Sequence, residues 1–255
     1  MKGFATYPSL QGRVVFITGG ASGIGATLVE EFVAQGSKVA YIDIDVASGE
    51  ALCVRLGKEF SNAPLFLFCD LTDISALREA IKVVATRLGP IQVLLNNAAN
   101  DRRHKVEETT PEVWDASVSV NLRHQFFAAQ AVLEGMRQLG GGSIINFGSV
   151  SWMVKTGGMP AYTSSKAAVQ GLTRGLARDF GPYNIRVNTL VPGWVMTEKQ
   201  LRLWIDAEAE RQIDAGQCLP ARVQPVDIAR MALFLAADDS RMCSAHDYIV
   251  DGGWV

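Results

Sequence analysis

The chain has 255 residues, of which 48% are hydrophobic and 20% are charged, and its formal net charge is −2. This balance is typical of a globular protein with one large α/β domain or two small ones. It argues against nucleic-acid and membrane partners, which usually bind a basic surface. No apolar run is long enough to span a membrane, and residues 1–20 lack the features of a secretory signal. We therefore expect a cytoplasmic protein.

The cysteines and histidines show no ligand pattern. The four cysteines are scattered without CxxC spacing, and the three histidines are equally dispersed. In a chain without a secretion signal, such cysteines indicate reduced thiols rather than disulfides. No metal site is expected. The short run DRRHK (101–105) is interpreted as a solvated loop.

Short apolar runs alternate with longer amphipathic segments along the whole chain. Strands are expected over 13–18, 38–43, 64–69, 91–97, 143–148, 184–191 and 247–253. Helices are expected over 23–36, 46–60, 73–88, 110–138 and 161–180, with another that begins at Pro225. Strands that are apolar on both faces and separated by helices predict a parallel sheet covered on both sides. With no linker or repeat, the pattern favours one domain.

The first strand is followed by a glycine-rich turn, TGGASGIG (18–25), with glycines at 19, 23 and 25. Glycine allows a tight turn and a close approach of the backbone to a pyrophosphate. The amides at the start of the following helix can then bind the phosphate charge. Because the string lies between a strand and a helix in the first βαβ unit, it predicts a dinucleotide site.

An acidic residue follows at the distance that this motif requires. Asp43 ends the second strand, 18 residues after Gly25. A carboxylate there can bind both ribose hydroxyls and would repel a 2′-phosphate, and neither Ser22 nor Ile44 supplies a cation for such a phosphate. We therefore expect NAD rather than NADP. The alternative is that Asp43 only caps the next helix. Asp70, at the end of the third strand, is a second candidate for the adenine edge.

The stretch AYTSSKAAVQG (161–171) places Tyr162 and Lys166 four residues apart, so both lie on one helical face. The pair alone is weak evidence, because this spacing often arises by chance. Other motifs accompany it: NNAA (96–99) at the end of the fourth strand, then Asn121, and Ser149 at the end of the fifth. With TGGASGIG, VPGWVMT and the final DGG, these stand in an order that resembles the short-chain dehydrogenase/reductase family over nearly the whole chain.

This resemblance implies a Rossmann-type, doubly wound parallel sheet of seven strands in a single domain, and usually a homotetramer. Tyr162 would be the base and Ser149 would hold the substrate oxygen. Lys166 would lower the pKa of the phenol and contact the nicotinamide ribose, while Asn121 would hold a relay water. The expected NAD contacts are Gly19, Ser22, Gly23, Ile24, Gly25, Asp43, Asp70, Leu71, Asn97, Ala98, Tyr162, Lys166, Pro192, Gly193, Val195 and Thr197.

The substrate is a narrower question. YPSL, NNAANDRRH, NLRH, INFGSVSW, AGQCLPAR and DGGW resemble bacterial NAD-dependent aldose 1-dehydrogenases of the xylose, arabinose or galactose type, which oxidise the anomeric hydroxyl to a lactone. Segment 194–220 is expected to be a lid-like substrate segment. The expected substrate contacts are Asn100, His104, Ser149, Ser151, Trp152, Tyr162 and Trp194.

Other interpretations stay open from the sequence. Both tryptophans can instead pack in the core or against a subunit, and the charges can be solvated. The chain can also be another short-chain alcohol dehydrogenase or carbonyl reductase with a 3-oxoacyl, steroid or polyol substrate. A non-catalytic NAD-sensing protein on the same fold is a further alternative.

Overall fold

The computed structural model describes residues 4–255 and has a central parallel sheet of seven strands. The order is β3-β2-β1-β4-β5-β6-β7: β2 and β3 lie on one side of β1, and β4 to β7 follow on its other side, so the strand order reverses between β1 and β4. The strands are β1 Val14–Thr18, β2 Lys38–Asp43, β3 Leu65–Phe68, β4 Val93–Asn96, β5 Gly142–Phe147, β6 Ile185–Pro192 and β7 Asp247–Val250. The predicted single-domain Rossmann-type sheet is confirmed.

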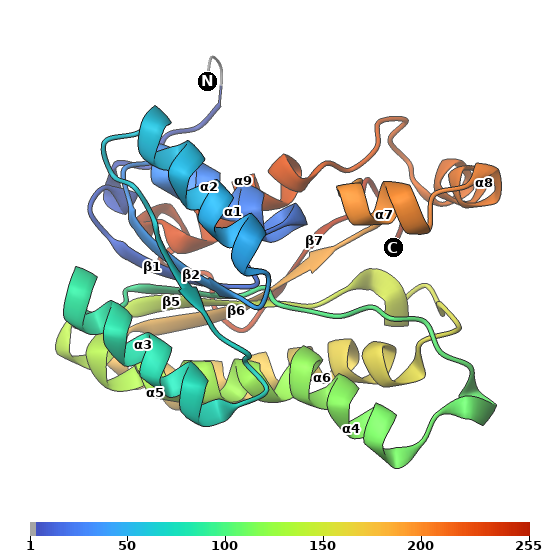
Figure 1. The fold of residues 1–255 in the computed structure, drawn as a ribbon, viewed down its shortest axis with the longest axis horizontal. Coiled ribbons are helices and arrows are strands. Elements are labelled where there is room, and N and C mark those ends of the chain that lie inside the picture. The colour runs from blue at the N-terminus through green and yellow to red at the C-terminus, as the bar shows by residue number, and fades with distance from the viewer. Residues whose placement is uncertain (1–3) are drawn as a thin grey trace.

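Helices cover both faces of the sheet (Figure 1). One face packs against α1 Gly23–Ala34, α2 Val46–Glu59 and α9 Pro225–Ala236, and the other against α3 Ile74–Leu88, α5 His124–Gln138 and α6 Pro160–Phe180. Alternate residues of one strand serve the two layers. In β1, Val15 and Ile17 enter the first core, while Val14 and Phe16 enter the second. This is why β1 carries apolar residues on both of its faces.

The predicted helix over 110–138 is helical from Pro111 to Gln138, but it is not a single α-helix. The structure has α4 Pro111–Val118, a π-helical turn Ser119–Arg123 and then α5. Asn121 lies in the π-turn, and its amide nitrogen donates to the Ser117 carbonyl oxygen at 2.9 Å. A π-turn inserts a residue without disturbing apolar periodicity on either side, so the sequence pattern does not show it.

The segment between β6 and α9 belongs to neither of the two helical layers. It contains α7 Glu198–Leu203 and α8 Ala207–Gly216, whose first turns are capped by Thr197 and Asp206. In Figure 1 both helices lie beyond the carboxyl ends of the strands, on the side of the α1–α9 layer. Their position places them over the edge of the sheet where parallel α/β proteins bind ligands.

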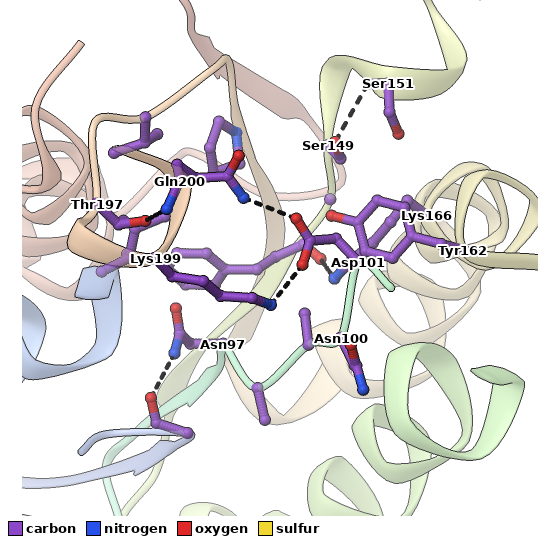
Figure 2. Close-up of a pocket in the computed structure, with 18 of the residues that line it drawn as sticks. Asn97, Asn100, Asp101, Ser149, Ser151, Tyr162, Lys166, Thr197, Lys199 and Gln200 are labelled. Atoms are coloured by element: carbon purple, nitrogen blue, oxygen red, sulfur yellow. Dashed lines mark hydrogen bonds and ion pairs between the residues drawn. The ribbon is translucent and has the colours of Figure 1, made fainter. Parts of the chain in front are cut away.

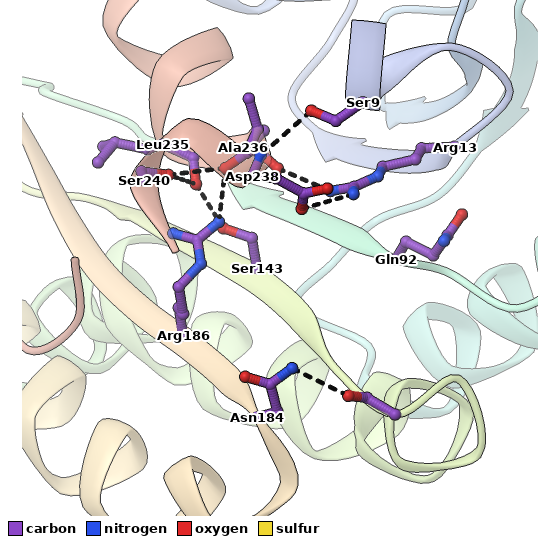
Figure 3. A network of polar contacts seen from close by, with 12 residues as sticks. Ser9, Arg13, Gln92, Ser143, Asn184, Arg186, Leu235, Ala236, Asp238 and Ser240 are labelled. Atoms are coloured by element: carbon purple, nitrogen blue, oxygen red, sulfur yellow. Dashed lines mark hydrogen bonds and ion pairs between the residues drawn. The ribbon is translucent and has the colours of Figure 1, made fainter. Parts of the chain in front are cut away.

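The opposite edge of the sheet is tied together by a polar network (Figure 3). The carbonyl groups that end α9 accept hydrogen bonds from side chains near the amino ends of three strands. The donors are Arg13, Ser143 and Arg186, and the acceptors are the carbonyl oxygens of Ala236, Leu235 and Ala237, respectively. Two of these donors are cations, which favour the negative end of a helix dipole. These bonds join the end of α9 to the starts of β1, β5 and β6.

Five short 3-10 turns complete the described chain: Pro8–Leu10, Val106–Glu108, Val150–Trp152, Gly181–Tyr183 and Asp238–Ser240. Within residues 4–255, no helix is both long and apolar enough to cross a bilayer.

Candidate active site

A cavity of about 870 Å³ opens at the carboxyl ends of the strands. Segments that follow β1 to β6 line it, and it spans the reversal point between β1 and β4, where doubly wound sheets bind ligands. Most of the predicted site residues line this cavity: Gly19, Ser22, Ile24, Gly25, Asp43, Asp70, Leu71, Asn97, Ala98, Asn100, Ser149, Ser151, Tyr162, Lys166, Pro192, Gly193, Trp194, Val195 and Thr197. Gly23, His104, Asn121 and Trp152 do not.

The turn between β1 and α1 forms a close-packed cradle. Gly19 has a φ of +67°, and a Cβ there would lie 2.7 Å from the Cα of Ala98. A Cβ on Gly25 would collide with the carbonyl oxygen of Gly19, so only glycine fits. Asn97 holds the turn by donating from its amide nitrogen to the same carbonyl oxygen at 2.9 Å.

The start of α1 is left open toward the cavity. Its N-cap residue, Ser22, makes no side-chain hydrogen bond to the first turn, although it lines the cavity. Free backbone amides at a helix N-terminus can donate hydrogen bonds to a phosphate group, and glycines, which lack side chains, let the phosphate come close to them. The residues present therefore fit a dinucleotide.

Asp43 closes the same cradle from β2. Its Oδ2 accepts the backbone N–H of Ala21 at 3.0 Å, which joins the end of β2 to the glycine turn. It does not cap α2, because the N-cap is Asp45, which accepts the N–H of Ser48 at 3.0 Å. The capping alternative for Asp43 is thus excluded, and its carboxylate lines the cavity.

Ser149, Tyr162 and Lys166 converge at the end of β5 (Figure 2). Lys166 is 1% exposed, and its Nζ donates to the carbonyl oxygen of Phe147 at 2.8 Å. The same Nζ lies 5.7 Å from the centre of the Tyr162 ring. The Oγ of Ser149 accepts the N–H of Ser151 at 3.1 Å, which leaves its own proton free to donate. A phenol, an ammonium and a hydroxyl thus share one wall of the cavity.

Burial dominates the titration of both α6 groups. It raises the pKa of Tyr162 to about 12, although the adjoining Ser149 hydroxyl lowers it in part. It lowers the pKa of Lys166 to about 7. The protein alone therefore does not produce the lowered phenol pKa expected from the sequence. Desolvation is the largest cause of both shifts, and a further positive charge beside the phenol would favour the phenolate.

Asn121 is fully buried and contributes to the site indirectly. Its Oδ1 accepts the N–H of Asn100 at 2.8 Å, and its Nδ2 donates to the carbonyl oxygen of Asn100 at 3.0 Å. The side chain thereby clamps the loop that follows β4. Its predicted role in holding a relay water stays a prediction.

The two aromatic candidates differ in position. Trp194 lines the cavity and packs against Trp254, with ring centres 6.3 Å apart. Trp152 and His104 are not among the lining residues, and the Nδ1 of His104 lies 3.2 Å from the carbonyl oxygen of Arg102. Direct contact of substrate with Trp152 or His104 stays a prediction that this geometry does not support.

Sequence reasoning missed a polar cluster that spans the cavity mouth. The Asp101 carboxylate accepts the Nζ of Lys199 at 2.6 Å and the Nε2 of Gln200 at 2.7 Å. Gln200 in turn accepts the Nε1–H of Trp194 at 3.0 Å. The expectation of a solvated loop is wrong for Asp101, since its side chain is only 20% exposed. No local signal reveals a pair of segments almost a hundred residues apart.

His124 was also missed. It is fully buried where α5 begins, and burial together with the charge of Lys166 lowers its pKa to about 3, so the imidazole is neutral. In the part of the chain that the structure describes, neither ring nitrogen has a hydrogen-bond partner. Over the same residues, no group of three or more His, Cys, Asp or Glu side chains is placed to hold a metal ion.

Comparison with known proteins agrees with this geometry. A family model described as enoyl-(acyl carrier protein) reductase matches residues 19–255. The chain belongs to the short-chain dehydrogenase/reductase family.

Within this family the chain is similar to two bacterial sugar dehydrogenases. It is 46% identical to a D-xylose 1-dehydrogenase of Caulobacter vibrioides over 98% of both chains. It is 45% identical to a probable galactose dehydrogenase of Rhizobium meliloti, over 97% of this chain and 96% of the relative. A blue fluorescent protein from a metagenomic library, solved with NADPH, is 33% identical with a TM-score of 0.89 and covers 97% of this chain and 99% of its own.

Proposed function

We propose that the protein oxidises the anomeric hydroxyl of an aldose sugar to the aldonolactone, with NAD as the hydride acceptor. The observation that carries the proposal is the convergence of Ser149, Tyr162 and Lys166 with a dinucleotide cradle in one cavity that has a polar mouth. The similarity at 45–46% identity to two sugar dehydrogenases over almost the whole chain supports the substrate class.

A bound nicotinamide supplies the acceptor for the hydride that leaves C1 of the sugar. The Oη of Tyr162 takes the proton of the C1 hydroxyl. The Ser149 hydroxyl donates a hydrogen bond to the C1 oxygen, which orients it and stabilises the charge that develops there. The Lys166 ammonium and the positive charge that an oxidised nicotinamide would bring beside the phenol would together favour the phenolate form of Tyr162, which is otherwise too weak a base at neutral pH.

The choice of NAD over NADP rests on Asp43. Its carboxylate lines the cavity at the end of β2 and would repel a 2′-phosphate. Among the described residues that line the cavity, the basic ones are Arg103, Lys155, Lys166 and Lys199, and none of these comes from β2 or from the glycine turn. A 2′-phosphate at that end of the cavity would meet a carboxylate without a compensating cation.

Three finer proposals accompany this function. Thr197 contacts the nicotinamide carboxamide, as the family resemblance implies. Segment 194–220, which includes α7 and α8, acts as a lid over the substrate. The protein assembles as a homotetramer in the cytoplasm, also by family resemblance, and the mass in solution tests that assembly.

The test is an assay of cofactor reduction with NAD or NADP against a panel of aldoses, polyols, and steroid and cyclic alcohols. Oxidation of aldoses with NAD, and capture of the lactone by hydroxylamine, is the expected outcome. Turnover of lipid or steroid alcohols alone would favour a different dehydrogenase of the family. NAD binding without turnover of any alcohol would favour the non-catalytic alternative.

A further inference from the structure

One polar group that lines the cavity has no part in the proton transfer just described. Asp101 lies in the loop after β4, and Figure 2 shows its carboxylate between Tyr162 and the side chains of Lys199 and Gln200 on α7. Each carboxylate oxygen has one donor: Lys199 at 2.6 Å on Oδ1 and Gln200 at 2.7 Å on Oδ2. The carboxylate is thus fixed in place from outside the reacting centre.

The negative charge of Asp101 opposes ionisation of the Tyr162 phenol. The negative charge of Asp101 contributes to raising the pKa of Tyr162, after burial, which is the main cause. Burial raises the pKa of Asp101, but the hydrogen bond and charge of Lys199 together with the hydrogen bond of Gln200 hold that pKa below its ordinary value, so Asp101 stays ionised. A carboxylate that hinders formation of the phenolate has no use in activating Tyr162. Its presence in the cavity wall needs another reason.

Hydrogen-bonding capacity offers that reason. An ionised carboxylate has about four lone-pair sites and no donor. One donor on each oxygen leaves both oxygens able to accept more. Leaving acceptor sites of a largely buried carboxylate without donors costs free energy, so the site favours a ligand that brings hydroxyl donors.

We propose that Asp101 is a substrate-specificity residue, whose carboxylate accepts hydrogen bonds from ring hydroxyls of the aldose other than the one oxidised. This inference rests on the proposed function and extends it. Gln200 and Lys199 orient the carboxylate, and Trp194 orients Gln200 through its indole N–H. An alcohol without neighbouring hydroxyls would enter the cavity but leave the remaining acceptor sites of the carboxylate without donors, and the site rejects it for that reason.

The opposing interpretation is that Asp101 only ties α7 to the loop after β4. Arg103 supplies a second tie between the same segments, since its guanidinium lies 5.1 Å from the ring centre of Trp204. The two roles differ in what a missing substrate hydroxyl does. If Asp101 is only a structural tie, loss of that hydroxyl does not change its contacts; if it is a specificity residue, the loss removes one of its hydrogen bonds.

The experiment compares the wild type, Asp101→Asn and Trp204→Leu on the best aldose and on its deoxy analogues, each lacking one ring hydroxyl other than the anomeric one. We expect the wild type to lose about 100-fold or more in kcat/KM on at least one analogue. Asp101→Asn keeps the side-chain volume but turns one acceptor into a donor. It should weaken kcat/KM on the full sugar, mainly through KM, and shrink the penalty for that analogue to a few-fold.

Trp204→Leu is the matched control, because it removes the Arg103–Trp204 contact between the same two segments and keeps the Asp101 carboxylate with both of its donors. It should retain the wild-type ratio between the full sugar and the analogue. Asp101→Asn should also move the pH profile of kcat/KM to lower pH, because a negative charge near Tyr162 is removed. A change in packing alone would not shift that profile in this direction.

Two results would overturn the assignment. One is a wild type that oxidises every deoxy analogue as well as the full sugar. The other is a uniform loss in Asp101→Asn across all analogues, which is the outcome for a tie. Asp101→Ser replaces the asparagine variant if that variant is not recovered folded. Failure of the wild type to oxidise any aldose is a separate outcome, which contradicts the proposed function and removes the assignment with it.

Discussion

The two halves of the cavity are built in different ways. The cofactor half is made of backbone: the turn after β1, with Gly19 packed against Ala98 and Gly25 against the Gly19 carbonyl, leaves no room for a single methyl group. The substrate half is made of side chains on loops and short helices, where Asp101, Gln200 and Trp194 form a chain of hydrogen bonds.

This difference indicates how each half can change. A backbone cradle recognises phosphate, which every dinucleotide carries, and its shape depends on glycines that cannot be substituted. The substrate half lies on segments outside both core layers, and their side chains can be exchanged with little effect on the cores. Specificity can therefore vary while cofactor binding is kept. Four substitutions test this contrast.

The largest effect is expected at the junction of the two halves. Tyr162→Phe removes the proton acceptor and keeps the ring, so kcat should fall about 10³-fold or more while NAD still binds. Initial rates of NADH formation and NAD titration by fluorescence measure the two properties. Tyr183→Phe, on an exposed residue beyond the end of α6, should leave both unchanged. Near-normal turnover of Tyr162→Phe would contradict the assignment of the base.

The next effect concerns the cofactor half. Gly25→Ala places a methyl group against the Gly19 carbonyl oxygen and should destabilise the fold by about 1–3 kcal/mol while abolishing NAD binding. Its Tm should fall by about 2–4 °C for each kcal/mol lost. Gly171→Ala on α6 faces open space, and it should raise stability slightly, because alanine favours a helix over glycine by about 1 kcal/mol. Equal behaviour of the two variants would refute the close-packed cradle.

A smaller effect is expected for the choice of cofactor. Asp43→Ala should shift the ratio of kcat/KM for NAD over NADP toward NADP by about 10- to 100-fold, since a hydrogen bond to a charged group contributes about 1.5–3 kcal/mol. Asp45→Asn is the control: it removes a neighbouring carboxylate but can still cap α2. An unchanged ratio in Asp43→Ala would mean that some other group selects the cofactor.

The smallest effect is on stability, and it depends on pH. The folded protein holds Lys166 with a pKa lowered to about 7, below its ordinary value of 10.5. Below pH 7 both states carry the proton, and the cost of burying the charge is complete. Between these two values the folded state has released the proton and the unfolded state has not, so stability rises with pH.

Lys166→Met removes this titration. It should raise the Tm of the cofactor-free protein at pH 6 by several degrees while abolishing turnover, and the gain should shrink as pH rises toward 9. Thermal unfolding of both proteins across this range is the measurement. A difference in Tm that does not depend on pH would show that burial in the folded protein does not lower the pKa of Lys166.

Much of the fold follows from local sequence. Each apolar run became a strand and each amphipathic segment a helix, because β1 and its neighbours bury alternate residues on two sides. The glycine turn, Asp43, and the Tyr162–Lys166 pair were also recognisable, since each is a short pattern whose chemistry depends on fixed spacing. The π-turn at Asn121 was not, because it leaves the apolar periodicity on both sides intact.

The sequence by itself therefore determined the strands and helices, the glycine turn and the Tyr162–Lys166 pair, each of which is a pattern within a short stretch of the chain. Only the tertiary structure decided that Asp101 meets Lys199 and Gln200 at the cavity mouth, and that Trp194 lines the cavity while Trp152 and His104 do not. It also decided the balance of pKa values, since the burial that raises the pKa of Tyr162 comes from packing around α6. Contacts between distant segments, and desolvation, depend on the folded chain as a whole.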